Sequence, residues 1–431
     1  MGWFGILAPR NAPNAAHRTD MTSFGSTFDR RRFLSAGAAA ATVAGFPSIV
    51  RAQSGKIRIG LMLPYSGLDA RQGVALENGF RLALKEVGGN FAGRETQFIK
   101  VNDESDPAKA MDNVERLLKR EKVDLVLGTV DTGVMVEMIR ATRAAGVLHI
   151  IPDGGFGPVA GALCAPNVFR TSYANWQSGY AMGSVLARRS ALKKVATLSW
   201  RFGAGEESVK GFRDAYLKGG GQIARELWLP YGATEFQALL TEIAVQKPDA
   251  VYAFLAGSAA TRFLRNYNQS GLTGSVPLFG PGFLTEGVLA SVRGAAEGVE
   301  TTLHYGDGLE TPKNKAFRRA YAKTYGMFPN MHAVAGYDAG LLFDAGMQAV
   351  KGDLGRKGPM IKAMEQARID SPRGPMRFSR THNPIHDQYL RKVVGNENRV
   401  MDIALKALDD DPAMQLACKM QPQDSVGAKR A

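Results

Sequence analysis

Residues 57–63 read IRIGLML, and residues 74–87 read VALENGFRLALKEV before Gly88-Gly89. The first stretch is a continuous apolar run of strand length, which is typical of a strand buried on both faces of a parallel sheet. The second has apolar residues at helical spacing and stops at paired glycines, which commonly end helices. A strand followed by such a helix predicts a βαβ unit, in which helices cover a parallel sheet.

The same alternation continues along the next part of the chain. Strands are predicted at 96–101, 123–127 and 147–151, with helices at 108–119 and 131–145 between them. Each strand is a short apolar run, and each helix is bounded by turn residues. These units together predict a first doubly wound lobe.

A second series of strands and helices begins after residue 171. Its strands are predicted at 194–200, 223–229, 250–255, 277–279 and 298–303, and its helices at 177–188, 205–218, 235–246 and 259–268. The chain then turns helical at 313–325, 332–350 and 360–367, and extended segments follow at 376–378 and 388–394. The expected fold class is therefore α/β, with two doubly wound Rossmann-like lobes.

The N-terminal part of the chain resembles a twin-arginine secretory signal. Arg30-Arg31 is followed by Phe33-Leu34, a short apolar run over 38–46, and the small-residue site that ends at Ala52. The alternative is a basic turn before an alanine-rich helix. We expect export by the twin-arginine machinery to the periplasm, with cleavage near Ala52. Because the leader before the arginines is long, Met21 is the better start.

The composition is that of a globular protein, with 45% hydrophobic and 22% charged residues. The formal net charge is +14, which could indicate a nucleic-acid partner. However, the basic residues are scattered along helices and are not clustered with aromatic residues. We therefore expect a solvated basic surface that favours anionic ligands, and no nucleic-acid partner. No later apolar run is long enough to span a membrane.

The chain has two cysteines, Cys164 and Cys418. In an exported protein, two cysteines more often form a disulfide than remain free thiols. Such a bond would tie the C-terminal tail to the middle of the chain. Two independent buried thiols are the alternative, since sequence alone does not show whether the two Cα atoms approach closely enough.

A search for catalytic and cofactor motifs finds none that fits its required context. There is no phosphate loop, no nucleophile elbow and no paired-histidine zinc motif. His382 and His386 are four residues apart, but Asn383-Pro384 between them breaks any helix that would present both. We therefore expect neither a cofactor nor a metal, and no enzymatic activity. A periplasmic enzyme on a doubly wound fold is the distant alternative.

Several motifs, taken in order, resemble one family. Residues 102–110 read NDESDPAKA, residues 169–171 read FRT, and residues 335–339 read AGYDA. With these motifs, residues 57 to about 406 resemble the periplasmic solute-binding proteins of the branched-chain amino-acid type, which feed ABC transporters. The resemblance implies the type I fold, in which three crossings join two lobes that close on a small ligand by hinge bending.

The resemblance also implies partners and domain bounds. The partners would be a small-molecule ligand and the permease subunits of an ABC transporter, and the protein would be a monomer. The leader would cover 1–52. The N-terminal lobe would contain 53–172 and 304–372, and the C-terminal lobe with the tail would contain 173–303 and 373–431.

The resemblance places the ligand between the lobes, but this chain departs from the amino-acid-binding pattern. Thr132 matches a hydroxyl that holds the ligand carboxylate in the family, whereas Asp153-Gly154 replaces a hydroxyl-bearing segment. The glutamate that binds the ligand ammonium is missing from residues 280–283, GPGF. Phe202 stands where the family has a tyrosine. An ammonium without its partner would be costly to bury.

These departures favour a small aromatic or otherwise apolar acid. Thr132, nearby backbone amides and Arg201 would hold its carboxylate, and Trp176, Phe202 and Phe283 would sandwich its ring. The alternative is that Asp153 replaces the missing glutamate, which would make the ligand an amino acid, a short amide or urea. The full set of candidate ligand-binding residues is Tyr65, Ser66, Asp131, Thr132, Asp153, Gly154, Trp176, Arg201, Phe202, Gly257, Pro281 and Phe283.

Overall fold

The computed structural model describes residues 55–67 and 69–420, and the predicted signal lies outside them. The first sheet has five parallel strands in the order β2-β1-β3-β4-β5. They are β1 (Ile57–Leu63), β2 (Thr96–Asn102), β3 (Leu125–Leu127), β4 (Leu148–Ile151) and β5 (Val168–Arg170). All seven residues of β1 except Arg58 are buried, as the apolar run predicts.

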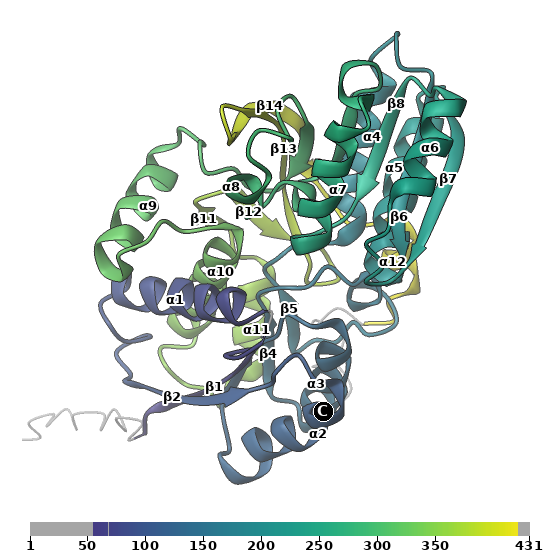
Figure 1. The fold of residues 1–431 in the computed structure, drawn as a ribbon. Coiled ribbons are helices and arrows are strands. Elements are labelled where there is room, and N and C mark those ends of the chain that lie inside the picture. Colours follow the sequence, from purple (N-terminus) through teal and green to yellow (C-terminus); the bar gives the residue numbers. More distant parts are fainter. Residues whose placement is uncertain (1–54, 68, 421–431) are drawn as a thin grey trace, which may run out of the picture. The chain divides into compact units, whose positions relative to one another are not determined.

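Helices from two distant parts of the chain cover this first sheet (Figure 1). The local ones are α1 (Ala70–Glu86), α2 (Pro107–Glu115), which continues into a π-helical turn (Arg116–Arg120), and α3 (Thr132–Ala145). The others are α10 (Met331–Ala349) and α11 (Lys357–Glu365), whereas α9 (Pro312–Tyr325) packs against α1. Leu342 and Phe343 of α10 share one hydrophobic core with Ile59 of β1. The chain thus returns to the first lobe after building the second.

The second sheet has nine strands in the order β11-β12-β13-β10-β9-β8-β6-β7, with β14 paired to β13. Five are parallel: β6 (Lys194–Arg201), β7 (Gln222–Pro230), β8 (Ala250–Phe254), β9 (Leu278–Pro281) and β10 (Glu300–Leu303). The others run antiparallel to their neighbours: β11 (Ile369–Ser371), β12 (Gly374–Phe378), β13 (Pro384–Val394) and β14 (Glu397–Leu408).

The helices of the second lobe are α4 (Asn175–Ala187), α5 (Gly203–Lys218), α6 (Gln237–Gln246), α7 (Gly257–Gln269) and α8 (Leu289–Val292). Both lobes therefore have the expected mixture of parallel strands and helices. Strand β14 was not predicted, because its apolar residues do not alternate regularly with polar ones and most of its residues are half-buried or exposed.

Helices α1 and α10 approach each other so closely that only glycine fits at their contact. A Cβ atom on Gly79 would lie 2.0 Å from the carbonyl oxygen of Ala333. We expect Gly79→Ala to lower the free energy of unfolding by about 1–3 kcal/mol, because the helices must move apart. Chemical denaturation would measure this loss. Gly308→Ala is the control, since nothing lies within 4 Å of its added Cβ, and an equal loss in both variants would contradict the packing argument.

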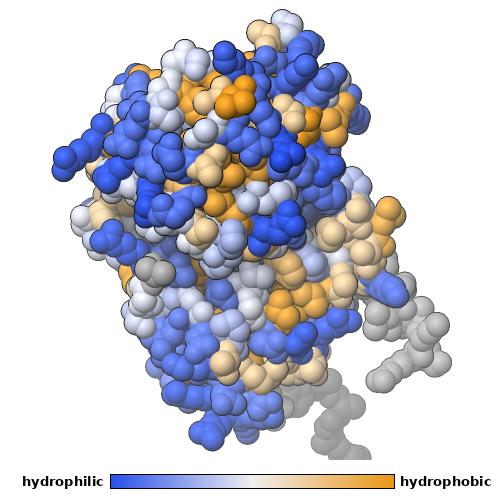
Figure 2. All heavy atoms as spheres, turned by 45° about the vertical axis from the view of Figure 1, so that its right-hand side comes forward, coloured by the Kyte–Doolittle hydropathy of each residue, from blue (hydrophilic) through white to orange (hydrophobic). Residues whose placement is uncertain are grey.

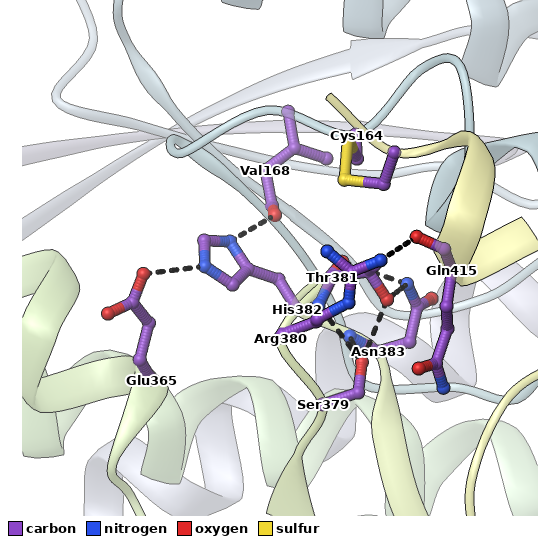
Figure 3. The surroundings of a disulfide bond; sticks show 10 residues. Cys164, Val168, Glu365, Ser379, Arg380, Thr381, His382, Asn383 and Gln415 are labelled. Atoms are coloured by element: carbon purple, nitrogen blue, oxygen red, sulfur yellow. Dashed lines mark hydrogen bonds and ion pairs between the residues drawn. A yellow bond between two sulfur atoms is a disulfide. The ribbon is translucent and has the colours of Figure 1, made fainter. Parts of the chain in front are cut away.

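The C-terminal tail is fixed to both lobes. The predicted disulfide is present: Cys164 is bonded to Cys418, with the Cα atoms 5.8 Å apart, at the end of α12 (Pro412–Ala417). Figure 3 shows this bond beside residues 379–383, where Arg380 donates to the carbonyl of Gln415. Ahead of α12, Asp410 pairs with the buried Arg170 at 3.3 Å. Asp411 accepts from Lys210 of α5 at 2.9 Å.

No helix among residues 55–67 and 69–420 is long and apolar enough to cross a membrane. The same residues contain no group of three or more side chains that could hold a metal ion. Figure 2 shows that hydrophobic surface on the face it presents forms separate patches among hydrophilic side chains.

Candidate functional site

The candidate site is formed by loops that follow the carboxyl ends of parallel strands, where ligands bind in sheets of this kind. Asp153 follows β4, Tyr173 follows β5 at the first crossing, and Phe283 follows β9 of the second lobe. The rings of Tyr173 and Phe283 lie 5.1 Å apart, measured between centroids. Residues that the sequence separates by more than a hundred positions thus come together where the lobes meet.

Asp153 is held by three donors and is only 3% exposed. Its Oδ2 atom lies 2.6 Å from Nδ1 of His332, the second residue of α10. Its Oδ1 atom accepts from the hydroxyl of Tyr173 at 3.3 Å and from the backbone N–H of Gly154 at 2.6 Å. The carboxylate is therefore already occupied by groups of the protein.

His332 is the basic partner of this pair. Burial alone would lower the pKa of His332, but the charge of Asp153 and the hydrogen bond to it outweigh burial, so the pKa is raised above its ordinary value of 6.5. The Asn330 side chain caps α10 and accepts from the backbone N–H of His332, which fixes the position of this residue.

A row of aromatic rings runs from this pair into the second lobe. Phe283 lies 6.0 Å from Phe254 at the end of β8, and Phe254 lies 6.0 Å from Phe202 after β6, measured between ring centroids. On the other side, Tyr173 stacks on His304 at 5.2 Å. Burial, followed by the charge of Arg373, lowers the pKa of His304 well below its ordinary value, so this ring is neutral. The row offers flat apolar contacts next to one charged pair.

Trp176 lies in the first turn of α4 (Asn175–Ala187), beside α5. Its ring stacks on Tyr180 at 4.3 Å, and its Nε1–H donates to Asp214 of α5 at 2.8 Å. Among the described residues, no ring contact joins Trp176 to Phe202 or Phe283. The sandwich of a ligand ring by these three side chains stays a prediction; in this structure the indole lies toward α5, to which it donates its N–H. Tyr173, three residues earlier, contacts Phe283 instead.

Arg201 is the last residue of β6 (Lys194–Arg201). Its guanidinium lies 5.3 Å from the ring centroid of Trp228 on the edge strand β7, and the residue is exposed. The alternative hypothesis had Asp153 bind the ammonium group of a ligand, and in the structure Asp153 is paired with His332. The Asp153–His332 pair meets the aromatic row through Tyr173, whose hydroxyl donates to Asp153.

The remaining candidates occupy loop and helix starts around the two sheets. In the first lobe, Asn102 of β2 bonds both the backbone N–H of Tyr65 and the hydroxyl of Ser66. Asp131 caps α3 by accepting from Val134 N–H, and Thr132 is exposed in the first turn of that helix. Gly154 has a φ of +84°, which favours glycine. In the second lobe, Gly257 is exposed at the start of α7, and Pro281 is buried at the end of β9.

Sequence reasoning missed Tyr173, Phe254 and His332. His332 lies 179 positions from Asp153, and no local pattern links the two. Tyr173 and Phe254 each end or follow a strand, so a search for every aromatic residue after a strand would have found them. A histidine in the first turn of a helix offers no comparable signal.

The sequence profile of the periplasmic binding proteins matches residues 56–398. Leu/Ile/Val-binding protein homolog 6 of Brucella melitensis biotype 1 is 27% identical over 350 residues, which cover 78% of this chain and 87% of the relative.

Two solved structures are similar over most of the chain. A solute-binding protein of an ABC transporter from R. palustris, in complex with benzoate, is 41% identical; the match covers 85% of this chain and 100% of that one, with a TM-score of 0.77. Another, from Rhodopseudomonas palustris BisB5 in complex with 3,4-dihydroxy benzoic acid, is 28% identical, with coverages of 83% and 99% and a TM-score of 0.76.

Proposed function

Because the chain belongs to the periplasmic binding protein family, of type I, we propose that it is the substrate-binding component of an ABC importer and that it binds a small aromatic carboxylate. The observation that carries this proposal is the row of rings from Tyr173 to Phe202 beside a charged pair. Such a row suits a flat apolar body, and a cation at its end suits a carboxylate.

The comparisons support the aromatic ligand. The relative that is 41% identical is in complex with benzoate, and the one that is 28% identical is in complex with a dihydroxybenzoic acid. The curated relatives named for leucine, isoleucine and valine are less similar, at 27% identity. An α-amino acid would also need a free acid for its ammonium, and Asp153 is already paired. Branched-chain amino acids, short amides and urea remain the second candidate class.

The remaining parts of the proposal concern delivery of the ligand. We propose that residues 53–172 with 304–372, and 173–303 with 373–431, move as two lobes about their crossings. Closure on the ligand would present one surface to the permease subunits. The family implies a location outside the cytoplasm. Twin-arginine export, cleavage near Ala52, a monomeric state and the absence of enzymatic activity belong to the same proposal.

A thermal-shift screen tests the ligand class. We expect the chain from Gln53 onward to be stabilised by benzoate or a hydroxybenzoate, by about 2.7 kcal/mol at a ligand concentration 100 times the dissociation constant. Leucine, a short amide and urea are the comparison ligands. Stabilisation by leucine alone would assign the protein to the second class, and no shift with any ligand would remove the support for both.

A further inference from the structure

The position of His332 gives it acidic neighbours from both lobes. Asp153 is in direct contact, and two further carboxylates act on His332 through their charge: Asp69, the residue before α1, and Glu286, in the turn after β9. Glu286 is itself paired with Arg391 at 2.9 Å, and His304 on the remaining side is neutral. The imidazolium is thus surrounded by loops of the candidate site, and Asp153 is the partner that fixes its orientation.

Only one nitrogen of His332 is used by the protein. Nδ1 is bonded to Asp153, which leaves the Nε2–H as the second donor of the charged ring. Among residues 55–67 and 69–420, Nε2 has no hydrogen-bond partner, and the His332 side chain is 17% exposed. Since Tyr173 contacts both Asp153 and Phe283, the pair lies directly at the first-lobe end of the aromatic row.

We propose that His332, oriented and kept charged by Asp153, binds the carboxylate of the ligand through Nε2, and that this pair selects carboxylates over neutral ligands of the same shape. The inference rests on the proposed function and assigns its anion-binding group. It also gives Asp153 a role unlike that of an ammonium-binding acid, since Asp153 acts through His332 and is a positioning residue.

The charge of this pair predicts a dependence on pH. The carboxylate is bound by the protonated ring, so affinity is full below the pKa of His332 in the free protein and falls as the pH rises through it. That pKa lies above the ordinary 6.5. Benzamide, which has the shape of benzoate without its charge, should show no such fall.

The experiment is isothermal titration of the chain from Gln53 onward with benzoate and with benzamide. In His332→Gln we expect benzoate to bind about 10- to 100-fold more weakly, the loss typical of a hydrogen bond to a charged group. Benzamide affinity should change by less than about threefold, a spread typical of a neutral contact. In Asp153→Asn, the fall in benzoate affinity should move to lower pH, because the ring loses its stabilising charge.

A matched control exists in a second histidine–carboxylate pair. His382 Nε2 lies 2.9 Å from Glu365 in α11, and its Nδ1 is bonded to the carbonyl of Val168 (Figure 3). The His382 ring stacks on Phe169, which is not part of the aromatic row. Glu365→Gln makes the same kind of change as Asp153→Asn in that pair. Glu365→Gln should leave the affinities for benzoate and benzamide unchanged, and also the pH dependence of benzoate binding.

Each outcome decides the inference. Equal binding of benzoate and benzamide by the natural chain, without the pH-dependent fall, overturns the role of His332 while the proposed function stands. Binding of leucine but of neither aromatic ligand overturns both. If His332→Gln does not fold, as judged by its thermal transition, the pH profiles of the natural chain and of Asp153→Asn still separate these results.

Discussion

Replacing Arg373 by methionine is expected to lower the free energy of unfolding by about 3–5 kcal/mol, because it leaves a buried charge without its partner. Arg373 and Asp338 are both 0% exposed, and their Nη2 and Oδ2 atoms lie 2.7 Å apart. Arg373 also donates to the backbone carbonyls of Thr171 and Ser172 at 2.9 and 2.8 Å. One side chain thus joins the segment after β11 to α10 and to the first crossing. Denaturation with guanidinium would measure the loss.

The pH dependence separates the charge effect from lost packing. Burial raises the pKa of Asp338 to about 6 even beside Arg373. Because this folded-state pKa lies above the unfolded value of 3.8, protonation of Asp338 stabilises the folded state. This contribution to the free energy of unfolding is complete below pH 3.8 and is lost as the pH rises through about 6. Without Arg373 the folded-state pKa of Asp338 rises further. The loss in free energy of unfolding caused by Arg373→Met should therefore become smaller as the pH is lowered from about 8 to about 5.

The control for this variant is Arg377→Met, which makes the same change four residues later at an exposed position of β12. It should alter stability by no more than about 0.5 kcal/mol, as is usual for surface substitutions. A pH-independent deficit in Arg373→Met would show that lost contacts, and not the unpaired Asp338 charge, cause the destabilisation.

Breaking the disulfide is the second large effect. Cys164 and Cys418 are separated by 254 positions, so the bond closes a loop of more than half of the 431-residue chain. We expect its removal to lower the free energy of unfolding by about 2–5 kcal/mol. The measurement compares guanidinium unfolding of the oxidised protein with unfolding in the presence of dithiothreitol.

A double variant, with serine at both cysteine positions, provides the control. Its transition should coincide with that of the reduced protein and should not respond to dithiothreitol. The ion pairs of Asp410 with Arg170 and of Asp411 with Lys210 remain in that variant. If oxidised and reduced protein unfold together, these pairs and the packing of α12 hold the tail without help from the bond.

The elements of this fold were determined by local sequence. The apolar run of β1 and the helical spacing of apolar residues in α1 indicate a strand and a helix from neighbouring residues alone. The reason is that the spacing of apolar residues decides which faces of an element can be buried. The same holds for the start of α2, where Asp106 caps the helix and accepts from the N–H of Ala108, two residues along the chain. Such signals need no knowledge of the rest of the molecule.

The contents of the candidate site were decided by the tertiary structure. Sequence placed Asp153, Phe202 and Phe283 after their strands, but it did not show that His332 would reach Asp153 from α10. Nor did it show that α4 would direct Trp176 toward α5 and away from Phe283. The physical reason is that the apolar run and the turn residues after it fix where a strand ends, whereas the direction of each loop side chain depends on what the other elements pack against it.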